Sequence, residues 1–152
     1  MQEKFTVLKW GNNLSTGLNW QNEQHKTLVE QINKLVNQED DTLDDILEFT
    51  KYYTATHFRD EEAMMVHYDY PALDAHIEEH GFFVNSMQEI FKENQKDKIK
   101  IRKILTELSA WLMWHIKNSD KEQADWLIKN TNIKNHQPTE FYEELENYRR
   151  NN

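Results

Sequence analysis

The sequence predicts an all-α protein: an up-and-down antiparallel four-helix bundle with an N-terminal arm and a short C-terminal extra helix. Only three glycines and two prolines occur among the 152 residues, and long stretches of Leu, Ile, Lys, Glu and Gln suit helices better than strands. In four segments the apolar side chains recur at helical spacing, which is typical of amphipathic helices. Four such helices joined by short connections pack most simply as an antiparallel bundle.

The helix boundaries follow from capping residues and polar breaks. We expect the first helix to begin near Asn22 as its N-cap and to end in the polar stretch NQEDD, and the second to run from about Thr42 to just before Tyr70. Pro71 suits the first turn of the third helix, because its missing amide hydrogen would have no partner there. The fourth helix follows the KENQKDK segment and extends to about Trp126.

Both ends of the chain differ from the helical middle. Residues 1–20 hold turn-forming residues and isolated tryptophans without a helical period, so we expect an arm that packs on the bundle. Residues 21–127 form the bundle, and residues 128–152 a C-terminal extension in which Pro138 opens a short helix after the polar break NTNIKNHQ. We expect residues 1–152 to form a single domain.

Charge and composition restrict the function. The formal net charge of -9 repels phosphate and anionic lipid, so we expect neither nucleic acid nor membrane partners. The absence of cysteine means that any metal is held by nitrogen and oxygen ligands. The N-terminus lacks the pattern of a secretory signal and no apolar run approaches the length of a bilayer span, so we expect a cytoplasmic protein.

The positions of the histidines are the most informative feature. Five of the seven lie in register with the apolar stripes and so face the bundle interior: His25, His57, His76, His80 and His115. His57 and Glu61 are four residues apart, as are His76 and His80, so each pair projects from one helix face and can reach a single ion.

Asp120 is the less obvious member of the set. It follows His115 by five residues, about 140° further round a straight helix, and we expect the nearby helix end to let it turn inward. Buried carboxylates and imidazoles without a compensating charge would cost several kcal/mol per ion, which a bound cation removes. Seven ligands exceed the needs of one tetrahedral zinc, so two ions bridged by carboxylates are the better count.

These residues stand in motifs that resemble the hemerythrin family, specifically its bacterial members. The matching stretches span roughly residues 8–121: EQHK around His25, HFRDEE from His57, YP at Tyr70, HxxxH from His76, and WLMWHIKNSD ending at Asp120. The family usually has Ile-Asp where this chain has Gln21 and Asn22, and we expect neither substitution to touch a ligand.

The resemblance implies a non-haem di-iron protein that binds dioxygen reversibly. His76, His80 and His115 would bind one iron, His25 and His57 the other, and Glu61 and Asp120 would bridge both. Leu112 matches the family's apolar lid over the oxygen site. From the residues alone zinc or manganese would also suit imidazole and carboxylate.

The function implied is oxygen storage, delivery or sensing without catalysis, and the partners would be dioxygen and either oxygen-consuming enzymes or a redox donor. Two alternatives stay open. The first is a di-iron enzyme, an oxidase, peroxidase or nitric oxide reductase, and the second is an oxygen- or iron-responsive signalling module. Oxygen-activating bundles tend to use more carboxylates and a Glu-x-x-His pattern, which favours the carrier.

Overall fold

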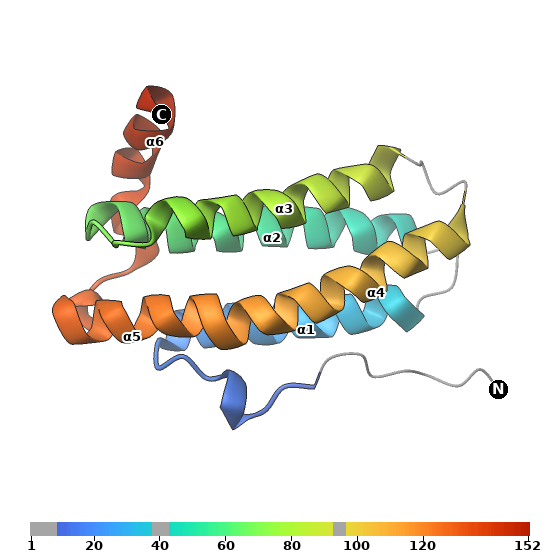
Figure 1. Ribbon diagram of the computed structural model, residues 1–152, viewed down its shortest axis with the longest axis horizontal. Coiled ribbons are helices and arrows are strands. Elements are labelled where there is room, and N and C mark those ends of the chain that lie inside the picture. The colour runs from blue at the N-terminus through green and yellow to red at the C-terminus, as the bar shows by residue number, and fades with distance from the viewer. Residues whose placement is uncertain (1–8, 38–42, 93–96) are drawn as a thin grey trace.

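Four long helices form the body of the protein. The computed structural model describes residues 9–37, 43–92 and 97–152, and the four helices are α1 (Asn19–Asn37), α2 (Leu43–His67), α3 (Leu73–Lys92) and α4 (Lys98–His115). They run side by side, with consecutive helices in opposite directions (Figure 1). Since α1 and α3 each contact both α2 and α4, the four helices enclose one interior. The predicted antiparallel bundle is confirmed.

The fourth helix continues well beyond its first segment. A π-helical turn, η3 (Ile116–Asp120), joins α4 to α5 (Lys121–Asn130). The chain then passes through two short 3-10 turns, η4 (Ile133–Asn135) and η5 (Pro138–Phe141), into the final helix α6 (Tyr142–Asn151). In Figure 1, α6 stands at one end of the bundle, at a steep angle to the long helices, and it packs on α2.

Two helix starts differ from the sequence prediction by a few residues. α1 begins at Asn19, and Asn22 lies inside it, where its side-chain oxygen accepts a hydrogen bond from the Thr16 amide at 2.9 Å. Asn22 therefore holds the arm against the helix instead of capping it. Pro71 lies in the turn before α3, where the Leu73 amide donates to the Tyr70 carbonyl at 3.1 Å. The predicted and observed starts of α3 thus differ by a single terminal turn.

The core consists of two clusters. The larger one contains buried residues from all four long helices, including Leu28, Phe83 and Leu105. The smaller one joins α2 to the C-terminal segment through Ala63, Met64, Leu127, Phe141 and Leu145, and also includes Leu18. Leu14 of the 3-10 turn η1 (Asn12–Leu14) belongs to the larger cluster. The described part of the N-terminal arm, from residue 9 onward, thus packs on the bundle as expected.

Within the described ranges, no helix combines the length and the apolar character needed to cross a membrane.

Two isoleucines in α4 provide a matched test of the core. Ile101 is fully buried, whereas Ile99 is 84% exposed. Replacing Ile101 by alanine removes buried methyl groups and leaves a cavity, so we expect Ile101→Ala to lower the free energy of unfolding by about 2–5 kcal/mol. Ile99→Ala is the control and should change it by less than about 0.5 kcal/mol. Urea denaturation of both variants measures the difference, and equal effects would contradict the assigned face of α4.

Candidate metal centre

The seven residues expected to bind metal lie together in the bundle interior. They come from all four long helices and the π-helical turn: His25 from α1, His57 and Glu61 from α2, His76 and His80 from α3, His115 from α4 and Asp120 from η3. Each is at most 3% exposed. Their ligand atoms form two groups, in each of which all atoms lie within 4.8 Å of one another. One group has His76, His80 and His115, the other has His25 and His57, and Glu61 and Asp120 belong to both.

Glu61 places one carboxylate oxygen toward each group of histidines. Its Oε1 lies 2.9 Å from Nε2 of His80 and 3.5 Å from Nε2 of His76. Its Oε2 lies 3.0 Å from Nε2 of His57 and 3.4 Å from Nε2 of His25. A carboxylate in this orientation can bridge two cations, each held by one of the two groups.

Asp120 has the same arrangement on the other side. Its Oδ1 lies 3.0 Å from Nε2 of His76 and 3.1 Å from Nε2 of His115, while its Oδ2 lies 2.9 Å from Nε2 of His25. Both carboxylates therefore divide their oxygens between the same two histidine groups.

The π-helical turn explains how Asp120 reaches the centre. We expected a helix end to turn its side chain inward, and that explanation is wrong, because the helix continues through α5. A π turn closes hydrogen bonds between residues five apart, so His115 and Asp120, which a regular helix would separate, lie on the same face. Single π turns of this kind are frequent at functional sites.

Polar partners outside the ligand set fix three of the histidine rings. Nδ1 of His57 lies 2.6 Å from Oε1 of Gln24, and Nδ1 of His80 lies 2.8 Å from Oε2 of Glu62. Because these partners can only accept, each Nδ1 donates its hydrogen outward, and Nε2 is the ring atom that faces the centre and would bind a metal there.

His115 has a comparable partner, since its Nδ1 lies 2.6 Å from Oε2 of Glu79. Sequence reasoning missed Gln24, Glu62 and Glu79. Glu62 directly follows the predicted ligand Glu61, and Glu79 directly precedes His80, so the carboxylates beside the ligands were a usable signal.

The hydrogen bonds of Gln21 contradict a second expectation. We predicted that the substitutions before the first histidine would touch no ligand, but the Nε2 amide of Gln21 donates to Oε2 of Glu61 at 2.9 Å and to Oε1 of Gln123 at 2.9 Å. Gln123 in turn donates to the main-chain carbonyl of Glu61 at 3.3 Å. The prediction was wrong because Gln21 precedes His25 by one helical turn and so shares its inward face.

Unpaired buried atoms indicate what the site accommodates. Nε2 of His25, His76 and His115 and both carboxylate oxygens of Asp120 are buried and have no partner in hydrogen-bond geometry among the described residues. The Nε2 atom of His25 lies 2.9 Å from Asp120, yet it is not aligned as a donor toward it. Buried polar atoms are otherwise almost always paired. Lone pairs that converge in this way fit a metal cation, and nitrogen and oxygen donors without sulfur suit a transition metal such as iron.

The charges of these groups are strongly coupled. Burial lowers the pKa of His25 and His76, but their contacts with Asp120 and Glu61 outweigh it and raise both pKa values to about 9. Burial also lowers the pKa of His115, but the nearby charge of Asp120 outweighs this effect and raises the pKa to about 10. Although burial raises the pKa of Glu61 and Asp120, the neighbouring histidines hold both well below their usual range.

Large apolar side chains surround the ligands. Phe58 stacks on the ring of His80 with centroids 3.9 Å apart, and Trp111 stacks on His115 at 4.8 Å. Leu112, one turn before His115, is 1% exposed and belongs to the larger core cluster. The centre is therefore enclosed by apolar surfaces, and the role of Leu112 as a lid stays a prediction.

The raised histidine pKa values predict a pH dependence of the metal-free protein. A pKa raised above 6.5 contributes stability that is fully present below about pH 6.5 and is lost as the pH rises through 9 to 10. We expect the free energy of unfolding of chelator-treated protein to fall between pH 7 and pH 10, by up to about 1.4 kcal/mol per pH unit for each proton. Urea denaturation across that range measures it, and a flat profile would contradict the coupling of these histidines to the carboxylates.

Comparison with known proteins agrees with this geometry. A family model described as the hemerythrin HHE cation binding domain matches residues 16–127. Relatives named Bacteriohemerythrin include one from Stenotrophomonas maltophilia (strain R551-3), 28% identical over 123 residues, which cover 78% of this chain and 80% of the relative. Another, from Pseudomonas aeruginosa (strain LESB58), is 31% identical over 122 residues with the same coverage. Since the matched range contains all seven converging side chains, the chain belongs to the hemerythrin family.

Proposed function

We propose that this non-haem iron-binding protein holds two iron ions bridged by Glu61 and Asp120 and binds dioxygen reversibly at one of them. The observation that carries the proposal is the division of both carboxylates between two histidine groups. A single ion would need only one oxygen from each carboxylate and could not reach all five imidazoles. Two ions use every converging donor.

The two groups differ by one ligand. We assign His76, His80 and His115 to the first iron and His25 and His57 to the second, in agreement with the distances to the two carboxylates. With the same two bridges, the second iron has one protein ligand fewer than the first. This difference would leave a coordination position for an external ligand on an iron held by His25 and His57, and an open position is the usual basis of reactivity at metal sites.

The donor set and the family support iron over zinc or manganese. The site offers five neutral imidazoles and two carboxylates. Two tetrahedral zinc ions that share both carboxylates as bridges would need only four imidazoles, so the fifth favours a metal with a higher coordination number. When bound, the iron pair supplies the electrons that dioxygen takes up on binding and gives back on release. The protein residues orient the irons and keep water away from the open position.

Leu112 is the residue that we assign to cover the open position. An apolar lid excludes water and a second iron centre, either of which would promote irreversible oxidation. Its burial and its place one turn before His115 support this role. Phe58 and Trp111, stacked on two of the ligands, continue the apolar enclosure.

We propose a carrier in preference to an enzyme. The described ligand set has mostly neutral donors, and no Glu-x-x-His pair lies within it, whereas oxygen-activating bundles use both more carboxylates and that pair. Storage, delivery to oxygen-consuming enzymes and sensing all fit a reversible site, and a redox donor would keep the irons reduced.

Metal reconstitution tests the function directly. We expect protein loaded with ferrous iron under inert gas to bind two irons per chain and to develop a visible absorption band in air that disappears on degassing, over repeated cycles. Iron analysis and absorption spectroscopy measure both properties. One iron per chain would overturn the bridged pair, and a band that does not reverse, or sustained consumption of dioxygen, would indicate an enzyme.

Two leucines of α4 test the lid. Leu112 and Leu108 are both buried, at 1% and 2% exposure, and Leu108 lies one further turn away from His115. We expect Leu112→Ala to admit water and to speed irreversible oxidation of the air-equilibrated protein several-fold, while Leu108→Ala lowers stability but leaves that rate close to wild type. Loss of the oxygen-dependent band over hours gives the rates. Equal rates in the two variants would remove Leu112 from the site.

A further inference from the structure

The C-terminal helix α6 lies outside the part of the chain that the family model matches, which ends at residue 127. It packs on α2, the helix that carries His57 and Glu61. Leu145 is fully buried in the smaller core cluster and Phe141 is 7% exposed, so apolar contacts hold the segment in place. The ring of His67 at the end of α2 stacks on Phe141 with centroids 3.8 Å apart.

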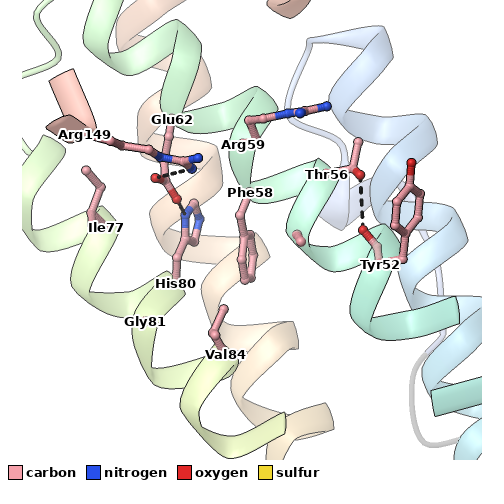
Figure 2. A pocket seen from close by; sticks show the side chains of 11 residues that line it. Tyr52, Thr56, Phe58, Arg59, Glu62, Ile77, His80, Gly81, Val84 and Arg149 are labelled. Carbon is pink, nitrogen blue, oxygen red and sulfur yellow. Dashed lines mark hydrogen bonds and ion pairs between the residues drawn. The ribbon is translucent and has the colours of Figure 1, made fainter. Parts of the chain in front are cut away.

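A first polar chain leads from α6 to the three-histidine group. The guanidinium of Arg149 donates to Oε1 of Glu62 at 3.2 Å, and Oε2 of the same carboxylate accepts from Nδ1 of His80 at 2.8 Å. Figure 2 shows the Glu62 carboxylate joined to the arginine by one of its oxygens and to the imidazole by the other. The Glu62 side chain is only 10% exposed, so its carboxylate depends on these two partners.

A second polar chain leads from α6 to the two-histidine group. The Tyr142 hydroxyl donates to Oδ1 of Asp60, and Oδ2 of Asp60 accepts from the Gln24 amide at 2.7 Å. The other end of that amide, Oε1, lies 2.6 Å from Nδ1 of His57. Asp60 therefore fixes the orientation of the Gln24 amide. If the amide were rotated by about 180°, its NH2 group would face Nδ1 of His57 and its oxygen would face the Asp60 carboxylate.

We propose that α6 is a positioning element for the metal centre, with Arg149 orienting His80 through Glu62 and Tyr142 orienting His57 through Asp60 and Gln24. The inference rests on the proposed function, since it assigns one of these two histidines to each iron. Outer partners that fix the ring and the tautomer of a metal-bound histidine typically change metal affinity by about 10–100-fold when removed. A helix outside the matched family range thus reaches both ions by separate routes.

A purely structural role for α6 makes different predictions. The Arg149 side chain is 42% exposed, and ion pairs of exposed side chains contribute about 0–1 kcal/mol to stability. Removing its charge should therefore leave folding almost unchanged and still alter the metal centre. If α6 only buried apolar surface, neither Arg149 nor the Tyr142 hydroxyl would influence the rate of iron release.

Four full-length variants in two matched pairs separate these roles. Arg149→Gln breaks the contact with Glu62, and its control is Arg150→Gln, since Arg150 bonds to Asn147 on its own helix. Tyr142→Phe removes only the hydroxyl that contacts Asp60. Its control is Tyr148→Phe, whose hydroxyl donates to Asp74 at 3.5 Å and is a member of neither chain.

The first measurement is the rate at which an excess of a ferrous chelator removes iron from each loaded variant under inert gas. We expect Arg149→Gln to speed the loss of one iron and Tyr142→Phe the loss of the other, each by about tenfold, with wild-type rates in both controls. Because the routes are separate, the double variant should lose both irons faster. Wild-type release from both Arg149→Gln and Tyr142→Phe, or equal acceleration in the controls, would overturn the proposal.

Arg149→Lys tests whether the charge carries the effect. A lysine keeps a cation that can reach Glu62, so we expect iron release close to the wild-type rate. If Arg149→Lys released iron as fast as Arg149→Gln, a charged contact with Glu62 would not be the cause, and the first route would be overturned.

A metal-free measurement distinguishes failure of this proposal from failure of the proposed function. In protein with ¹⁵N-labelled histidine, NMR detects the Nδ1 protons of His57 and His80 and their exchange with water. We expect the His80 proton to exchange faster in Arg149→Gln and the His57 proton in Tyr142→Phe, with no change in the controls. This result supports the two chains even if the protein bound fewer than two irons, whereas unchanged exchange in both variants would refute them.

Discussion

Two carboxylates buried in an apolar bundle are the constraint on which the rest of the structure depends. Glu61 and Asp120 are both fully buried, and a charge taken out of water costs several kcal/mol unless it is compensated, comparable with the whole stability of a domain of this size. Five imidazoles from four helices surround them. In the metal-free protein, the raised pKa values of His25, His76 and His115 let protons on these three rings balance the charge. Metal ions and protons therefore compete for the same donors, and the site links folding to metal binding.

The geometry of the centre required one departure from regular helix. A straight α-helix cannot bring residues five apart onto one face, and the π turn at Ile116–Asp120 achieves it without ending the helix. The continuous helix then carries Gln123 to the main chain of Glu61. One local irregularity thus positions Asp120 directly and supports the second carboxylate from the same helix.

The periodic part of this design could be predicted from the sequence, and the irregular part could not. Histidines in register with apolar stripes, and the four-residue spacing of His57 and Glu61, indicate the bundle and most of the ligand set because helical geometry alone determines them. The π turn has no such signature, so Asp120 was included in the ligand set but its inward position was explained wrongly. Gln24, Glu62 and Gln21 were missed because their partners are distant in sequence, and only the packing of α1, α2 and α3 brings them together.

The two polar chains differ in a way that follows from their endpoints. Glu62 brings a negative charge to His80, which makes the imidazole a stronger donor, while the Gln24 amide at His57 is neutral. The three-histidine group therefore has the more electron-rich surroundings, and the two-histidine group has the less electron-rich ones. Arg149 partly balances the negative charge of Glu62. Through this contact α6 would adjust the difference between the two histidine groups, which already differ in their number of histidines. The four long helices and the π turn provide the candidate ligands, and the role that we propose for α6 is to determine how firmly His57 and His80 are held.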